Sequence, residues 1–223
     1  MKRLAAEAAV AAVTDGMVLG LGTGSTAAFA VEALGRRVAE GLRVVGVPTS
    51  ERTAAQARKL GIAVTALDDH PVIDLTIDGA DEVDPATLAL VKGLGGALLR
   101  EKLVAASSRR MTVIVDESKV VGRLGAGRAR LPVEVVRFGA VATLARLRAE
   151  GVDPALRQAP GGELFVTDNG NLVADCATGP IDDPAALHGR LKSLVGVVET
   201  GLFIGLATSV VVGAPGGPRI LEH

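Results

Sequence analysis

The chain has 223 residues, of which 48% are hydrophobic and 2% aromatic, and its formal net charge at pH 7 is −1. This length is enough for one large domain or two modest ones, and the hydrophobic content excludes an intrinsically disordered chain. Nucleic acid and anionic membranes are disfavoured as partners, because the chain has no long basic tract and almost no aromatic side chains on which bases could stack.

The single cysteine, Cys176, excludes an intramolecular disulfide and a metal site built from several cysteines. The N-terminal segment lacks the long apolar core of a signal peptide, since Glu7 and Asp15 interrupt it. No run reaches the roughly 18 apolar residues that span a bilayer. We therefore expect a soluble, cytoplasmic protein. The last residues, Leu221–His223, resemble an expression-vector remnant and are given no function.

The first part of the chain alternates predicted helices with short apolar strands. Residues 2–14 have good helix propensity. Further helices are expected from the end of the glycine-rich segment at Thr26 to about Glu40, from Ser50 to Leu60, and around Glu101. Ser50 is suited to cap its helix, and Gly61 suits the position just after the end. The predicted strands are Met17–Leu21, Arg43–Val47, Ile62–Leu67, Ile73–Ile77, Leu88–Val91 and Met111–Val115.

This alternation predicts an α/β fold with a doubly wound, mainly parallel, Rossmann-like sheet, in which right-handed crossovers place helices on both faces. The pattern changes after the segment from Gly122 to Arg130, which is rich in glycine and arginine. We predict a catalytic domain of residues 1–130 plus 199–223, and a smaller α+β domain of residues 131–198.

The smaller domain is predicted from a βαββα-like order of elements. Its strands are expected at Pro132–Arg137, Leu164–Val166 and Leu172–Ala174, and its helices at Ala140–Glu150 and Asp183–Leu194. An Asn-Gly pair between the second and third strands is a strong hairpin signal. The final apolar runs, Leu202–Leu206 and Val210–Val212, are expected to return to the large sheet.

A glycine-rich loop, Gly22–Thr26, follows the first predicted strand and opens a helix. We interpret it as a phosphate site, because Thr23, Ser25 and Thr26 supply hydroxyls and the helix N-terminus supplies N–H groups. A dinucleotide site is the alternative, but it predicts an acidic residue at the end of the second strand, where Val47-Pro48-Thr49 stands. A tight turn without a ligand is the third interpretation.

The stretch from Asp74 to Lys102 carries the second candidate site. Asp78 and Asp81 follow one apolar run, Lys92 follows the next, and a glycine turn, Gly93–Gly96, then leads to a helix with Glu101. Ligands bind outside the carboxyl ends of strands in α/β sheets, so these groups are expected to converge. They are suited to moving a proton next to a carbonyl while holding negative charge on oxygen.

Each of these residues also has an ordinary structural interpretation. The segment Asp78–Asp81 has the composition of an acidic turn, Lys92 that of a solvated strand end, and Glu101 that of a helix surface. A divalent metal is a third possibility, but His70, His188 and His223 are not near the aspartates in sequence. The two aspartates, Lys92 and Glu101 lie within 24 residues, after a candidate phosphate loop. This concentration favours a functional site.

Taken together, these motifs resemble the family of ribose-5-phosphate isomerases, type A, over nearly the whole chain. The resemblance rests on Gly22–Thr26, Asp78–Asp81, Lys92–Gly96, Leu99–Lys102, Asp116–Lys119, Leu131–Glu134, Thr167–Asn171 and Gly196–Phe203. It implies interconversion of D-ribose 5-phosphate and D-ribulose 5-phosphate in the pentose phosphate pathway, with no cofactor and no metal. It also implies a homodimer or a dimer of dimers. One departure is Leu94, where several relatives have glycine.

The resemblance places the catalytic base at Glu101. It places substrate-binding positions at Thr23, Gly24, Ser25, Thr26, Asp78, Gly79, Ala80, Asp81, Lys92, Gly93, Leu94, Gly95 and Lys119. As hypotheses, Asp81 with help from Asp78 would open the sugar ring, and Glu101 would move a proton between C2 and C1. Lys92 and the N–H groups of the glycine turn would hold the enediolate oxygen.

Two rival functions are considered. A sugar-phosphate sensor of a transcriptional regulator would need a DNA-binding module, and no such basic segment precedes Thr14. An amino-sugar phosphate deaminase would need a catalytic histidine, for which His70 is the only candidate.

Overall fold

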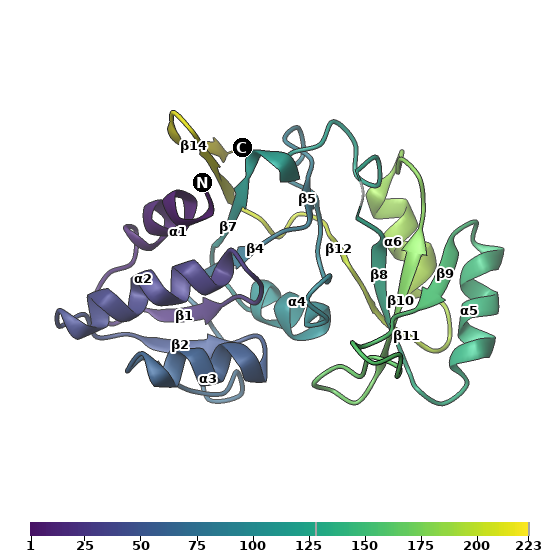
Figure 1. The fold of residues 1–223 in the computed structure, drawn as a ribbon, viewed down its shortest axis with the longest axis horizontal. Coiled ribbons are helices and arrows are strands. Elements are labelled where there is room, and N and C mark those ends of the chain that lie inside the picture. The colour runs from purple at the N-terminus through teal and green to yellow at the C-terminus, as the bar shows by residue number, and fades with distance from the viewer. Residues whose placement is uncertain (128, 223) are drawn as a thin grey trace.

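The computed structural model describes residues 1–127 and 129–222. Its main sheet has seven strands in the order β14-β13-β7-β4-β1-β2-β3, and all neighbours are parallel except the β13–β14 pair (Figure 1). The strands are β1 (Val18–Leu21), β2 (Val45–Pro48), β3 (Ala63–Val64), β4 (Leu75–Gly79), β7 (Met111–Asp116), β13 (Ser209–Ala214) and β14 (Gly217–Glu222). The predicted doubly wound α/β sheet is confirmed.

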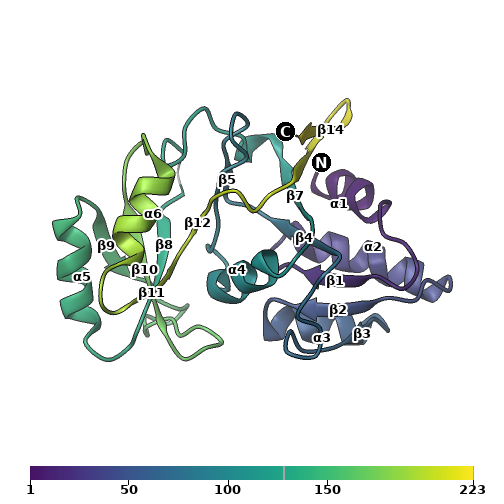
Figure 2. The same cartoon turned by 180° about the vertical axis from the view of Figure 1, so that it is seen from behind.

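Alternation along the strands gives the sheet two apolar faces. Leu19, Leu75 and Ile114 pack in one core with buried alanines and valines of α1 (Lys2–Val10) and α2 (Ala27–Ala39). The other face, which includes Val113 and Val212, packs with Ala105 of α4 (Leu98–Ala106). Figure 2 shows α4 on the opposite side of the sheet from α1 and α2. The remaining helix of this part is α3 (Glu51–Lys59).

A separate three-stranded antiparallel sheet, in the order β12-β6-β5, lies between the two ends of the molecule (Figures 1 and 2). Its strands are β5 (Glu82–Val83), β6 (Leu90–Val91) and β12 (Leu202–Phe203). The prediction that Leu202–Leu206 returns to the large sheet is therefore wrong. The buried Phe203 instead packs with the β5–β6 hairpin and the underside of the large sheet. Val210–Val212 does return to the large sheet, within β13.

The remaining sheet has four antiparallel strands in the order β11-β8-β10-β9. Its chain order is β8 (Leu131–Val135), α5 (Ala140–Ala149), β9 (Asp153–Leu156), β10 (Leu172–Ala177), α6 (Pro184–Lys192) and β11 (Val197–Thr200). This βαββαβ order is that of a ferredoxin-like unit. The predicted domain division stays a prediction, and β11 crosses its boundary at residue 198.

The second half contains two differences from the predicted strands. The expected strand Leu164–Val166 is reduced to single bridges, Gln158 with Leu164 and Val166 with Leu172, and β9 pairs with β10 in its place. The sequence did not indicate β9, because its apolar residues are interrupted by Asp153 and Pro154. The Asn-Gly turn is present, with Thr167 N–H donating to the Asn171 carbonyl.

The ends of the large sheet also differ from expectation. The expected strand Ile62–Leu67 shortens to the two residues of β3. Leu221 and Glu222, which were expected to be a functionless remnant, belong to the edge strand β14, and His223 lies outside the described residues. A short 3₁₀ helix, η1 (Glu117–Lys119), follows β7. In the described part of the chain, no helix is both long enough and apolar enough to cross a bilayer.

Candidate active site

The candidate site lies where the order of the large sheet reverses direction. Strands β1 and β4 are neighbours, but the chain leaves β1 toward β2 and continues from β4 toward β7, which makes their carboxyl ends a topological switch point. The loop Gly22–Thr26 follows β1, and Asp78 lies near the end of β4. Gly22 is required there, because an added Cβ would lie 2.1 Å from Asp78 Oδ1.

The loop Gly22–Thr26 presents backbone donors at the start of α2. Within residues 1–127 and 129–222, no acceptor is found for the N–H groups of Gly24, Ser25 and Thr26. Gly24 has φ +123°, a conformation that glycine adopts readily. Ser25 is exposed, and its hydroxyl accepts a hydrogen bond of 2.9 Å from Lys2 Nζ. Free N–H groups at a helix N-terminus next to a lysine favour an anion.

Thr23 has a different environment from the one the sequence suggested. Its hydroxyl lies in a buried cluster, 2.7 Å from Thr49 Oγ1, 2.7 Å from Ser50 Oγ and 3.0 Å from Thr53 Oγ1. Its N–H donates to Asp78 Oδ1 at 3.1 Å. Both donors of Thr23 are thus engaged inside the protein, so this residue holds the loop and Asp78 together. Buried hydroxyls of this kind leave no recognisable sequence pattern.

Asp78, Lys92 and Glu101 form a buried charged cluster. Lys92 Nζ lies 2.9 Å from Asp78 Oδ2 and 3.4 Å from Glu101 Oε2, and none of the three side chains is more than 3% exposed. Asp78 comes from β4, Lys92 from the residue after β6, and Glu101 from the first turn of α4. The short β5–β6 hairpin turns Lys92 back toward the end of β4, where its ammonium also donates to the Gly79 carbonyl.

The cluster shifts the protonation of all three groups. Burial raises the pKa of Glu101 to about 8; Lys92 opposes this rise, while Asp78 and Asp81 add to it. Burial also raises the pKa of Asp78, against the effect of Lys92. For Lys92 burial works toward a lower pKa, but Asp78, Glu101 and Asp81 outweigh it and the pKa is raised. Lys92 therefore stays a cation beside Glu101, whose pKa burial raises to about 8.

The glycine turn Gly93–Gly96 lies next to Asp81 and to the loop that follows β1. Asp81 Oδ2 accepts a hydrogen bond of 2.9 Å from Leu94 N–H. A Cβ added to Gly95 would lie 3.7 Å from Thr23 Cγ2, so the turn is next to the loop that follows β1. The N–H group of Gly95 has no acceptor among the described residues. The turn thus offers an unpaired donor next to the loop that follows β1.

The two cations that flank Glu101 in sequence hold α4 in place. Arg100 binds Glu51 at 2.8 Å and Asn169 Oδ1 at 3.0 Å. Lys102 Nζ binds Glu199 Oε1 at 2.8 Å and the carbonyls of Thr200 and Leu202, around the start of β12. Glu101 itself is only 2% exposed, so the surface interpretation of this residue is wrong.

A cavity of about 700 Å³ opens at Asp81, whose charge acts on Lys92 and Glu101. Asp81, Leu94 and Lys119 line it together with residues just before β8, such as Arg130, and with Asp175 of β10. The structure therefore brings Asp81 and Lys119 to one cavity, and it places Asp78, Lys92 and Glu101 in the neighbouring interior. His70, in the connection from β3 to β4, belongs to neither group.

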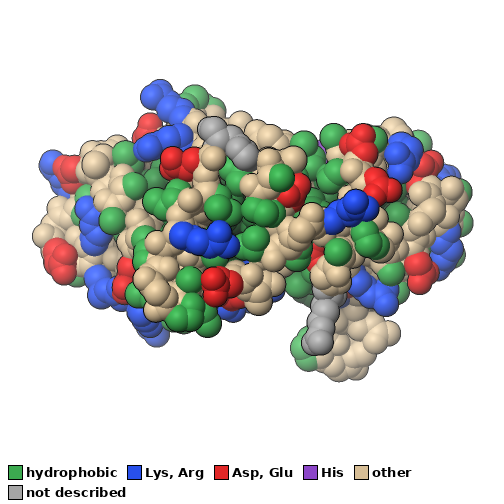
Figure 3. All heavy atoms as spheres, turned by 90° about the horizontal axis from the view of Figure 1, so that it is seen from above, with side chains coloured by type: hydrophobic (Ala, Val, Ile, Leu, Met, Phe, Trp, Pro, Cys, Tyr) green, Lys and Arg blue, Asp and Glu red, His purple; other side chains and the backbone are tan. Residues whose placement is uncertain are grey.

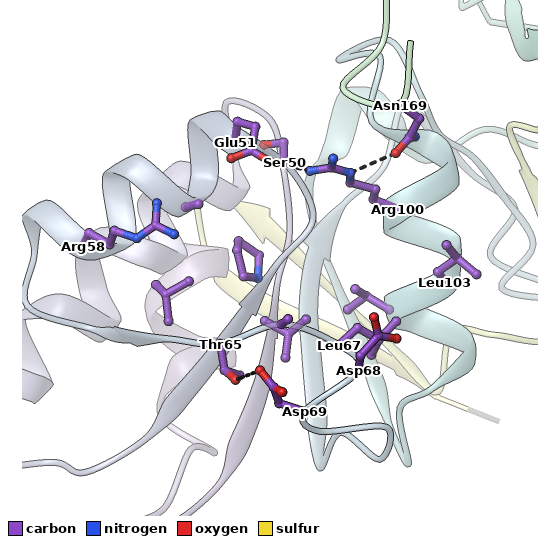
Figure 4. A pocket seen from close by; sticks show the side chains of 16 residues that line it. Ser50, Glu51, Arg58, Thr65, Leu67, Asp68, Asp69, Arg100, Leu103 and Asn169 are labelled. Carbon is purple, nitrogen blue, oxygen red and sulfur yellow. Dashed lines mark hydrogen bonds and ion pairs between the residues drawn. The ribbon is translucent and has the colours of Figure 1, made fainter. Parts of the chain in front are cut away.

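A second hollow, shown in Figure 4, contains none of the predicted site residues. It has a volume of about 690 Å³ and lies between α3, the segment after β3 and α4. Arg100 crosses its rim to Asn169, and Leu103 and Thr65 face it (Figure 4). No group of three or more metal-ligating side chains occurs in the described ranges 1–127 and 129–222.

The family model for ribose 5-phosphate isomerase A (phosphoriboisomerase A) matches residues 45–217. The chain belongs to this family. A relative from Synechococcus sp., named ribose-5-phosphate isomerase A, is 55% identical over 100% of this chain and 97% of its own. Another from Gloeobacter violaceus is 54% identical over 99% of this chain and 95% of its own.

Solved structures agree with this assignment. The ribose 5-phosphate isomerase A of Methanocaldococcus jannaschii superposes with a TM-score of 0.95 at 38% identity, over 100% of this chain and 98% of the other. A D-ribose-5-phosphate isomerase in complex with phospho-erythronic acid superposes with a TM-score of 0.95 at 37% identity, over 100% of this chain and 97% of the other. The fold of this family member is therefore shared along its full described length.

Proposed function

We propose that the protein interconverts D-ribose 5-phosphate and D-ribulose 5-phosphate through an enediolate, with Glu101 as the base. The observation that supports this most directly is the position of Glu101, a buried carboxyl 3.4 Å from the Lys92 ammonium. A related isomerase forms a complex with phospho-erythronic acid, a sugar-acid phosphate.

The phosphate is assigned to the loop Gly22–Thr26. Its N–H groups at the start of α2 favour an anion, and Lys2 and Lys119 add positive charge near the carboxyl ends of β1 and β7. Both lysines act on the same carboxylate, Asp116: burial works to raise its pKa, but the Ser118 hydrogen bonds, with help from Lys2 and Lys119, outweigh burial and lower it. Holding the remote phosphate fixes the reacting carbons with respect to Glu101, which is the contribution of positioning to the rate.

The proton transfer follows from the geometry of the cluster. Glu101 removes the proton from C2, a C1–C2 double bond forms, and the electron pair of the carbonyl moves to O1. The charge on O1 is stabilised by Lys92 and by N–H groups of the glycine turn. The hydroxyl proton then passes from O2 to O1, and Glu101 returns its proton to C1. One carboxyl serves both carbons because they are adjacent.

Ring opening is assigned to Asp81, with Asp78 in support. Asp81 lines the cavity and accepts from Leu94 N–H, so its second oxygen is available to a sugar hydroxyl. Asp78 is fully buried and bound to Lys92 and to Thr23 N–H, so it acts by holding the cation and the loop.

The rival deaminase function would need a histidine at the site, and neither histidine in ranges 1–127 and 129–222 lies there. His70 lies outside the cluster and the cavity, and His188 binds Thr200 Oγ1 at 2.7 Å within the four-stranded unit. The rival function, a sugar-phosphate sensor, requires only binding, so it gives no role to Glu101 as a buried base. We therefore favour isomerisation over both.

The decisive experiment is an isomerase assay on ribose 5-phosphate, followed by ketose absorbance, with the variant Glu101→Gln. We expect kcat to fall roughly 10²- to 10⁴-fold with substrate affinity retained, because the amide has the shape of the acid but cannot accept the proton. The control is Glu32→Gln on the surface of α2, where Arg3 is the only partner of the carboxylate among the described residues. Near-normal turnover of Glu101→Gln would remove Glu101 as the base.

A further inference from the structure

Arg157, just after β9, reaches out of the four-stranded unit to the glycine turn. Its Nη1 donates to two consecutive carbonyls, Gly93 O and Leu94 O, each at 3.0 Å. Its other edge binds Asp175, with Nε 2.9 Å from Oδ2 and Nη2 in contact with Oδ1. The Arg157 side chain is only 12% exposed. Nothing in the sequence singled out this arginine, because its partners are distant backbone atoms.

Phe165 contacts both Arg157 and the glycine turn. The Arg157 guanidinium lies 5.6 Å from the centre of the Phe165 ring. The ring packs so closely against Gly96 that a Cβ added there would lie 2.3 Å from Phe165 Cζ. Phe165 N–H also donates to the Arg157 carbonyl at 2.9 Å. Three residues of one unit, Arg157, Asp175 and Phe165, therefore hold a turn that belongs to the other.

The two carbonyl contacts determine where two N–H groups point. In a trans peptide the C=O of one residue and the N–H of the next point in opposite directions. Arg157 binds the Gly93 carbonyl, and Leu94 N–H on the far side of that peptide donates to Asp81 Oδ2 at 2.9 Å. Arg157 also binds the Leu94 carbonyl, so Gly95 N–H points away from the arginine as well.

We propose that Arg157, oriented by Asp175, is a positioning residue for the isomerisation. It holds the glycine turn so that Leu94 N–H orients Asp81 and Gly95 N–H is directed at the oxygen that becomes negative. This inference rests on the proposed function and gives the four-stranded unit a part in it. Arginine is suited to the position because its planar fork donates to the two carbonyls and to a carboxylate at once. A lysine ammonium has no such fixed geometry.

The test uses the full-length variants Arg157→Ala, Arg157→Lys and Asp175→Asn. We expect kcat of Arg157→Ala to fall about 10- to 100-fold, the size of effect that a misplaced donor produces, with KM changed by less than about threefold. Arg157→Lys should not restore kcat. Millimolar guanidinium chloride should recover part of the turnover of Arg157→Ala but none of the loss in Glu101→Gln, because Asp175 lines the open cavity and is accessible to a small cation.

The matched control is Arg190→Ala, which removes a half-exposed arginine that binds Glu150 on the surface of the same unit. A folded Arg157→Ala or Asp175→Asn with kcat within twofold of the parent, or a loss carried by KM alone, would overturn the proposal. If Arg157→Ala does not fold, the same criteria apply to Asp175→Asn, which keeps the side-chain shape. Failure of the proposed function would look different, because the parent and Arg190→Ala would then also lack isomerase activity.

Discussion

At the scale of single residues, the chemistry depends on a carboxyl that is hard to ionise. Glu101 is buried, has Asp78 and Asp81 as negative neighbours, and faces a lysine that Asp78 already neutralises in part. Its Oε2 receives no well-aligned hydrogen bond within the described residues. The charged form is therefore costly, and the protonated form persists to higher pH than in an exposed glutamate. A base of this strength both accepts a proton from carbon and returns it.

This environment predicts a pH dependence of kcat/KM. Because Glu101 must be ionised to act and burial raises its pKa to about 8, kcat/KM should rise with pH below that value and level off above it. Initial rates measured from about pH 6.5 to 9.5 would locate the midpoint of this rise. The midpoint lies above the second pKa of a phosphate ester, near 6, so it is distinguished from titration of the substrate. A profile that is flat between pH 7 and 9 would contradict the assignment of the raised pKa to the base.

At the scale of elements, one turn of the four-stranded unit fastens the helices that surround the site. Asp168 Oδ2 accepts from Glu51 N–H at 2.9 Å, at the start of α3, and Asn169 binds Arg100 of α4. The turn is itself held by the buried Glu134, whose Oε1 accepts from the Thr167 hydroxyl at 3.0 Å. A carboxylate at a helix N-terminus satisfies a free donor and complements the helix dipole.

We therefore expect Asp168→Ala to lower the free energy of unfolding by about 1 kcal/mol, the usual effect of removing a helix cap. Urea unfolding followed by circular dichroism would measure it. The control is Asp182→Ala, since within the described part of the chain Asp182 forms only an exposed pair with Arg123, and such pairs contribute little. Equal stability changes in the two variants would mean that the contact of Asp168 with α3 does not stabilise the fold.

At the scale of the molecule, the surface mixes both charge signs but is not uniformly polar. Acidic and basic side chains are interspersed on the face shown in Figure 3, as expected for a net charge of −1. Near the connection from β8 to α5, however, Phe138 is 94% exposed and Val141 78%, and Val195 before β11 is 78% exposed. Exposed apolar patches of this kind mark contact surfaces.

We expect the chain to form a homodimer or a dimer of dimers, with this apolar surface in contact with a second copy. Size-exclusion chromatography with light scattering should give a mass two or four times the 22.6 kDa of the chain. Phe138→Asp should lower that mass, whereas Val72→Asp, at an exposed apolar residue between β3 and β4, should not. The mass of a single chain for the parent protein would rule out the assembly.

Much of the architecture follows from local signals in the sequence. The β1–α2 and β4 segments could be predicted because a buried parallel strand is a short apolar run, and a parallel neighbour needs a helical crossover. Ser50 capping α3 and Gly61 after its end, with φ +74°, are local properties of two residues. The concentration of Asp78, Asp81, Lys92 and Glu101 in one stretch was visible for the same reason.

Other features depended on contacts between distant residues. Whether Leu202–Phe203 joins the large sheet or pairs with β6 is decided by which apolar surface is left to cover, and a short apolar run is compatible with both. The burial of Glu101 and its pKa near 8 arise only when β4, β6 and α4 meet. Thr23 in its hydroxyl cluster and Arg157 on the glycine turn have partners 26 to 64 residues away. The sequence by itself thus determined the family, the alternating elements and the charged residues, because these are local patterns. The tertiary structure alone decided which donors remain free and which groups change their pKa, because both depend on what is excluded from water.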